Sequence, residues 1–195
     1  MRTSLRCFAQ ALPAKRSFRT FVEHVFDTID SANAWELAHC RFVVSKQTIT
    51  IGSLPDYADL SKLAERSFGH ALPALAVAVA SGTNTHSAAF KHLQQGLKHY
   101  LIVKQLNDDV HDWQTDLEHG HISYAVACAL TDAGTTPGSH QLPKLVTKVE
   151  RVFWYQTLPV LSQTMQEHVT ACRQALAASQ LCKPKNPIAS KLAGL

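Results

Sequence analysis

A row of carboxylates follows the segment from Gln105 to Asp116. Its members are separated by steps of one to four residues: Gln105, Asp108, Asp109, Asp112 and Asp116. If the segment is helical, a rotation of about 100° per residue places all five within roughly a third of the helix circumference. One side of a single helix would therefore carry four carboxylates and one amide.

This acidic row weakens the helix that carries it. Asp108 and Asp112 are like-charged neighbours four residues apart, as are Asp112 and Asp116, and Asp is also a poor helix former. A cation would remove the repulsion, and Mg²⁺ prefers carboxylate oxygens, retains several waters and is often shared with substrate phosphates. We therefore interpret the row as a magnesium site; the alternative is a solvated acidic face.

A long helix over residues 85–118 must position this row. Apolar residues on another of its faces have the spacing of a core stripe: Val103, Leu106, Val110, Trp113 and Leu117. Leu97 and Leu101 precede Asp108 and project to nearly the same side of the helix. In a hollow bundle they would give a pocket with an acidic mouth and an apolar floor; alternatively, the two leucines pack on another helix.

The pattern Gln-x-x-Asp-Asp-x-x-Asp, followed by Gly120, resembles the second aspartate-rich motif of trans-isoprenyl diphosphate synthases. These enzymes belong to the class I isoprenoid synthases. The segment Gly120-His121-Ile122-Ser123-Tyr124 is similar to the family's Gly-Lys-Ser-Thr-Tyr segment, which opens the next helix. The resemblance is clearest over residues 66–130.

The resemblance implies a Mg²⁺-dependent enzyme that binds an isoprenoid diphosphate, as a prenyltransferase or a terpene synthase does. Asp108, Asp109 and Asp112 would be the catalytic carboxylates that hold Mg²⁺, and Asp116 would be a weaker metal ligand. Gln105 would support the carboxylates or contact the diphosphate. The metal would neutralise the leaving diphosphate in a pocket that holds little water.

The same resemblance implies further substrate-binding residues, Leu101 among them as part of the apolar floor. Arg66 falls where the family carries a Lys-Thr pair near the diphosphate, and its planar fork suits phosphate; a surface salt bridge is the alternative. Lys104 stands where the family usually has Phe, and it could pair with Asp108 or with phosphate. His121 replaces a family Lys and would be only partly charged at neutral pH.

A first aspartate-rich motif is missing from this pattern. Asp30 lies only 78 residues before Asp108, much closer than in the family, and Asp27 and Asp30 do not form a doubled Asp. A polar helix face, or a buried Asn33 or Glu36 bonded to another helix, fits that segment better. A homodimer or a partner chain would then supply the motif. The alternative function is a non-catalytic structural or regulatory subunit with a prenyl synthase-like fold, and a third is an all-α metal-dependent phosphohydrolase.

The other predicted helices rest on apolar residues at three- and four-residue steps. They cover residues 17–40, 60–81 with a kink at Pro73, 124–131, and 142–181 with a break near Pro159. Residues 41–55 are rich in β-branched side chains and are expected to form a short hairpin or an extended loop. Residues 135–139 are predicted to be a loop, and His119 and His121 a solvent-exposed turn.

Composition indicates one all-α domain over residues 1–195, with residues 1–16 and 183–195 expected to be flexible. The resemblance implies that this domain is a helical bundle of the isoprenoid synthase type, and a partial version of it. The net charge is +4, and no basic block is interleaved with aromatic residues, so nucleic acid is not expected as a partner. No apolar run is long enough for a membrane span. Five cysteines, without metal-ligand spacing, indicate reduced thiols and a cytoplasmic location.

Overall fold

The computed structural model describes residues 16–58 and 60–182, and over these ranges the chain is mostly helical, as predicted. The α-helices are α2 (Arg16–His39), α3 (Ser61–Ser67), α4 (Leu72–Ala80), α5 (Ala88–Glu118), α6 (Tyr124–Asp132), α7 (Leu142–Val152) and α8 (Leu158–Ser179). A 3-10 turn, η1 (Phe68–Ala71), joins α3 to α4. A π-helical turn, η2 (Phe153–Thr157), joins α7 to α8.

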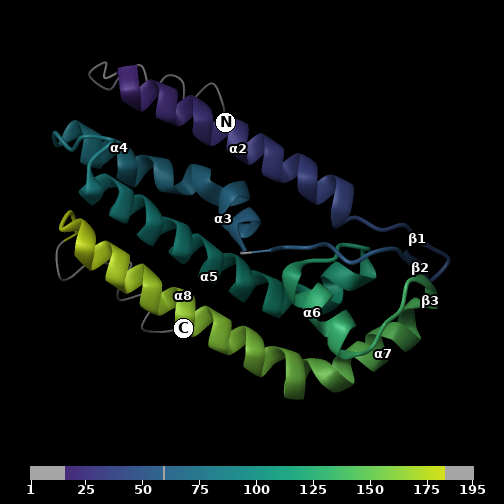
Figure 1. Cartoon of the computed structure of the whole chain (residues 1–195). Helices are drawn as coiled ribbons and strands as arrows, with labels where there is room; N and C mark the ends of the chain where they lie inside the picture. The colour runs from purple at the N-terminus through teal and green to yellow at the C-terminus, as the bar shows by residue number, and fades with distance from the viewer. Residues whose placement is uncertain (1–15, 59, 183–195) are drawn as a thin grey trace.

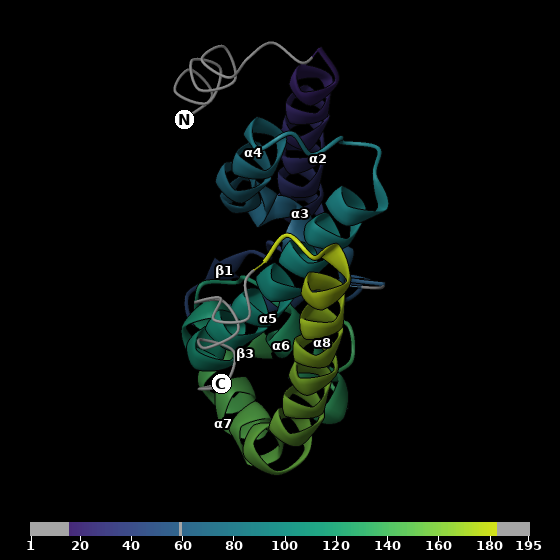
Figure 2. The ribbon, with the colours of Figure 1, turned by 90° about the vertical axis from the view of Figure 1, so that its left-hand side faces the viewer.

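The long helices are stacked in rows. Figure 1 shows α2 as one outer row, α3 and α4 as the next, then α5, and α8 as the other outer row. The view turned by 90° keeps this order, with α5 between α3 and α8 (Figure 2). Helix α5 is therefore the central element, and its two sides meet different partners.

The apolar seam of α5 packs on α8, which runs in the opposite direction. Val103, Leu106 and Leu117 are fully buried in this core. Gly96 allows a close approach of the two helices, because a Cβ at this position would lie 2.7 Å from Cδ2 of Leu176. The helix begins after Ser87, whose hydroxyl accepts a hydrogen bond from the backbone N–H of Phe90.

A small antiparallel sheet lies at one end of the rows. Of the two expected alternatives for residues 41–55, a hairpin or an extended loop, the hairpin is present, as β1 (Val44–Ser45) and β2 (Thr48–Ile51), with Val44 opposite Ile49. The prediction of a loop at residues 135–139 is wrong at its end, because β3 (Gly138–Gln141) pairs with β2. The sequence of β3 is polar and exposed, so it lacked the apolar alternation by which a strand is recognised.

Proline marks both predicted breaks in the helices. Pro73 lies in the first turn of α4, where a proline is tolerated, and the chain leaves the α-helical path just before it in η1. Pro159 has the same position in α8, directly after η2. Among the described residues, no helix is both long and apolar enough to cross a membrane.

Candidate functional site

The acidic row on α5 is divided between solvent and the protein interior. Asp108 and Asp112 are exposed, whereas Asp109 is only 4% exposed and Asp116 is partly buried. Nζ of Lys104 lies 3.6 Å from Oδ2 of Asp108, which is the predicted pairing one helical turn apart. The row is therefore not a single cradle of carboxylates, because its members face two environments.

The end of α5 positions a histidine beside the inward carboxylates. Gly120 has a φ of +70°, and the N–H of His121 donates to the carbonyl of Asp116, which is a Schellman ending of the helix. A Cβ at Gly120 would lie 2.2 Å from the backbone oxygen of Phe42. Gly120 is therefore required for two reasons: its backbone conformation disfavours a side chain, and the segment after α2 leaves no room for a Cβ.

His121 bridges two carboxylates. Its Nδ1 lies 3.1 Å from Oδ1 of Asp116, and its Nε2 lies 3.2 Å from Oε1 of Glu36. Both ring nitrogens can donate only when the imidazole is charged. Burial opposes that charge, but the hydrogen bonds to Asp116 and Glu36 outweigh it and raise the pKa of His121 to about 9. The predictions of an exposed turn and of partial charge at this position are both wrong, since His121 is buried and cationic at neutral pH.

Glu36 connects α2 to this cluster. Its carboxylate accepts hydrogen bonds from Arg66 on α3 and from Arg41, whose Nη2 lies 3.2 Å from Oε1. The hydrogen bond from His121 lowers the pKa of Glu36, burial opposes this, and Arg66 lowers it further, to about 2. The expected hydrogen bond to another helix is thus confirmed for Glu36, which is partly buried, while Asn33 is exposed.

Asp109 is the most deeply buried carboxylate of the cluster. Nε2 of Gln105 donates to its Oδ1 at 2.8 Å, so the supporting role expected of Gln105 toward a carboxylate has a structural counterpart. Burial raises the pKa of Asp109 to about 6, although Gln105, Arg66 and His121 all act to lower it. Ionised Asp109 is therefore held at a cost to the stability of the fold.

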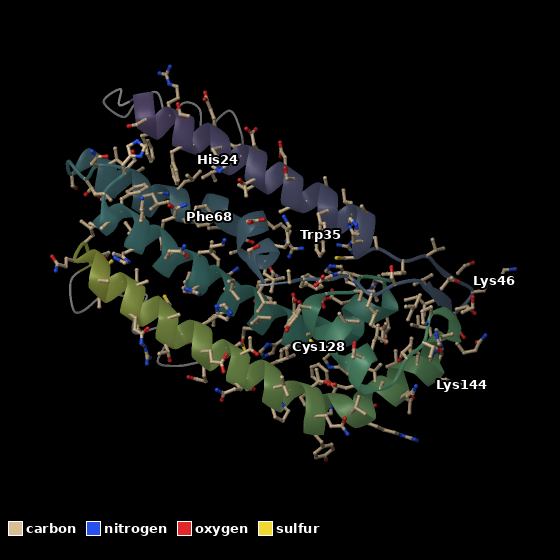
Figure 3. The ribbon with its side chains drawn as sticks, in the orientation of Figure 1. His24, Trp35, Lys46, Phe68, Cys128 and Lys144 are labelled. Atoms are coloured by element: carbon tan, nitrogen blue, oxygen red, sulfur yellow. The ribbon has the colours of Figure 1, made fainter. Side chains whose placement is uncertain are left out.

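A narrow cleft of about 10 Å³ lies beside Asp109. Oδ2 of Asp109 and Oγ of Ser123 are buried and have no hydrogen-bond partner in the protein, and both residues line this cleft together with Arg66. Trp35, on the side of α2 that faces the rest of the molecule, also lines it (Figure 3). The space suits about one water molecule, which two polar groups without partners would bind.

The predicted apolar floor is packed rather than open. Leu97 is 5% exposed and Leu101 is 3% exposed, and both belong to the core cluster. Of the two alternatives for these leucines, packing within the fold is the one observed. The described residues thus place no open apolar pocket around Leu101, and its predicted contact with a substrate has no structural counterpart in these residues.

The donor set does not fit a self-contained Mg²⁺ site. Over residues 16–58 and 60–182, no group of three or more His, Cys, Asp or Glu side chains is arranged to hold a metal ion. Asp109 faces a cleft for about one water and has two cationic neighbours, Arg66 and His121, which disfavour a second cation there. Asp108 and Asp112 are open to solvent and provide two carboxylates at most, so the remaining ligands of a Mg²⁺ on them would be waters or substrate phosphates.

Comparisons of the chain with models of protein families, with characterised proteins and with solved structures found no match.

Proposed function

We propose that this chain is a non-catalytic structural or regulatory subunit whose helices are arranged as in an isoprenoid synthase. One observation carries the proposal: each inward carboxylate of the aspartate-rich helix is bonded to at least one group of the protein itself. His121 bridges Asp116 to Glu36, and Gln105 holds Asp109. Together with the ion pair between Arg66 and Glu36, these contacts join α2, α3 and α5, and they hold Asp109 and Asp116 to protein groups rather than to a metal–diphosphate complex.

The relation to the isoprenoid synthase type is supported by the order of the elements. The Gln-x-x-Asp-Asp-x-x-Asp pattern lies on one long helix, α5, and Gly120 ends that helix before α6 begins at Tyr124. Arg66, which stands where the family carries its Lys-Thr pair, projects from α3 toward the same cleft as Asp109. A non-catalytic relative of these enzymes would be expected to keep the helix order while its carboxylates bind side chains of the protein instead of a metal.

A Mg²⁺-dependent enzyme that binds an isoprenoid diphosphate is the second candidate. It is favoured by the exposure of Asp108 and Asp112, which are one helical turn apart and accessible to a hydrated cation. In that case a partner chain, or a second copy in a homodimer, would provide the carboxylates that this chain lacks. Lys104 and Arg66 would be the cationic groups closest to the phosphates.

Thermal unfolding distinguishes the two candidates. The wild type is melted alone, with Mg²⁺, with geranyl diphosphate and with both. A ligand at about 100 times its Kd adds about 2.7 kcal/mol to stability, which raises Tm by several degrees for a chain of this size. We expect no rise that requires Mg²⁺ and diphosphate together.

A double variant, Asp108→Asn with Asp112→Asn, provides the control for the exposed carboxylates. A matched variant of exposed acids on α2, Glu23→Gln with Asp27→Asn, removes the same charge elsewhere. A rise in Tm that the first variant abolishes and the second retains would reject the non-catalytic proposal and establish the diphosphate-binding one.

A further inference from the structure

The corner at which α7 meets α8 lies at an edge of the molecule, on the side away from α2 (Figure 1). Three basic side chains follow one another along the exposed face of α7 at steps of four and three residues: Lys144, Lys148 and Arg151. They line an open depression of about 390 Å³ together with Pro143 and Thr147. Lys144 projects outward from α7 in Figure 3.

No acidic side chain lines this depression. Glu150, the acidic residue of α7, is turned about 100° around the helix from Arg151 and so lies on a different side. Lys148 donates to the carbonyl of Gly134, a neutral group, which leaves its charge uncompensated by that contact. This face of α7 is therefore positively charged along its whole length.

Two exposed aromatic side chains follow the basic residues of α7 in the turn that leads to α8. Trp154 is 51% exposed and Tyr155 is 84% exposed, and both lie in the π-helical turn η2. A π turn contains one more residue than an α turn, and such turns are often found at functional sites. In η2 this geometry exposes three consecutive residues, the last of which is Gln156.

The π turn is anchored from within, so its outward side chains are presented by a fixed structure. The ring of Phe153 stacks on that of Trp113 with centroids 4.8 Å apart. The hydroxyl of Thr157 donates to Oδ2 of Asp132 at 2.5 Å. Phe153 and Thr157 are both buried, so the first and last residues of the turn are held in the core while the residues between them face outward.

We propose that this basic–aromatic corner, made of Lys144, Lys148, Arg151, Trp154 and Tyr155, docks on the anionic headgroup layer of a lipid bilayer. Basic side chains near such a surface are attracted by its negative potential, and Trp and Tyr favour the zone between headgroups and acyl chains. The apolar part of the corner is small; Val160, at the start of α8, is a further exposed apolar residue. This apolar surface is smaller than the apolar centre of a stable protein–protein interface. Docking on a headgroup layer needs less apolar surface, because the basic side chains contribute to the attraction. The inference is independent of the proposed function.

Co-sedimentation with vesicles tests the docking surface. The full chain is mixed with vesicles of phosphatidylcholine and phosphatidylserine, and in parallel with vesicles of phosphatidylcholine alone. The corner variant carries Lys144→Gln, Lys148→Gln and Arg151→Gln. The matched control, Arg19→Gln, Lys91→Gln and Arg173→Gln, removes three exposed charges from α2, α5 and α8. Circular dichroism establishes that both variants remain folded.

Each basic residue at an anionic surface contributes about fivefold to binding, so the corner variant should bind about 100-fold more weakly than the wild type. The control variant should stay close to the wild type. Binding should require phosphatidylserine and should weaken with salt. Absence of wild-type binding to the anionic vesicles, or an equal loss in both triple variants, would overturn the proposal.

Tryptophan fluorescence gives a readout of the aromatic part. Brominated lipids should quench the wild type, and the quenching should disappear in Trp154→Phe, because Trp113 is buried and Trp35 lies on α2. Quenching that persists in this variant contradicts docking through the corner.

A short DNA duplex serves as an alternative polyanion. If the corner variant loses DNA binding while its vesicle binding equals that of the wild type, the surface is one for nucleic acid and the lipid proposal is wrong.

Discussion

The substitution Asp109→Asn should stabilise the protein at neutral and alkaline pH. Burial raises the pKa of Asp109 from 3.8 to about 6. At about 1.4 kcal/mol for each pKa unit, ionised Asp109 costs the fold about 3 kcal/mol. An asparagine has nearly the same shape, and its amide oxygen can still accept the hydrogen bond from Gln105. Because asparagine is uncharged, the free-energy cost of burying a charge is removed.

The gain should depend on pH in a defined way. Below about pH 4 the carboxyl is protonated in both the folded and the unfolded chain, so the charge penalty is absent. Between pH 4 and 6 the unfolded chain loses the proton first, and the wild type therefore becomes less stable relative to the variant. Above pH 6 the difference is complete. Since an amide N–H₂ in the same cleft has its own desolvation cost, the net gain should be about 1–3 kcal/mol.

Urea unfolding of the wild type and of Asp109→Asn, followed by circular dichroism at pH 4, 5, 6, 7 and 8, measures this difference. The exposed Asp112→Asn is the control, and it should change stability by less than about 0.5 kcal/mol. The reasoning is refuted if Asp109→Asn is less stable than the wild type at pH 8. That result would mean that the ionised carboxylate is matched by a cation and contributes to stability.

Four further substitutions test other contacts of the fold. The variant His121→Gln should be about 3 kcal/mol less stable than the wild type at pH 6.5 and below. In urea titrations this stability difference should vanish as the pH rises through about 9, because wild-type His121 loses its proton there. A stability difference that does not depend on pH would contradict the charged bridge. The variant Gly120→Ala should cost more than about 3 kcal/mol, because the new Cβ meets the backbone of Phe42 at 2.2 Å, and a melting temperature equal to that of the wild type would argue against this contact. In Gly96→Ala the Cβ meets Leu176 at 2.7 Å, so about 1–3 kcal/mol should be lost, whereas Gly69→Ala, with its nearest neighbour at 3.5 Å, should lose less than half as much.

The helices were predictable because their signals are local. Apolar spacing and the positions of Pro73 and Pro159 indicated each helix and each break, and β-branched residues indicated the hairpin. The third strand was missed because its partner, β2, is distant in the sequence and its side chains are polar. Pairing across some 90 residues leaves no local pattern when the strand has no buried face.

The acidic row was recognised, but its division into two environments was not. Helical periodicity places Asp108 and Asp109 only about 100° apart, and tertiary packing decides which of them is covered. His121, in the turn after α5, connects inward Asp116 to Glu36, which lies near the end of α2. Glu36 and His121 are 85 residues apart, so the contact between the Glu36 carboxylate and the His121 imidazole could not be predicted from sequence spacing.

The basic–aromatic corner could not be predicted from the sequence for the same reason: it depends on tertiary structure. Lys144, Lys148 and Arg151 do not form a block in the sequence, and only the helical turn of α7 brings them onto one face. The π turn that exposes Trp154 and Tyr155 depends on tertiary anchors at Phe153 and Thr157. Such anchors have no sequence signature that separates them from ordinary core residues.

Nitrogen-15 NMR of the His121 ring tests most directly whether the inward carboxylates form an internal charge cluster or a metal cradle. We predict that both ring nitrogens are protonated at pH 7.5, that the imidazole titrates near pH 9, and that millimolar Mg²⁺ with geranyl diphosphate leaves the signals unchanged. A neutral ring at pH 7.5, or a downward shift of its pKa when Mg²⁺ and diphosphate are added, would contradict the account.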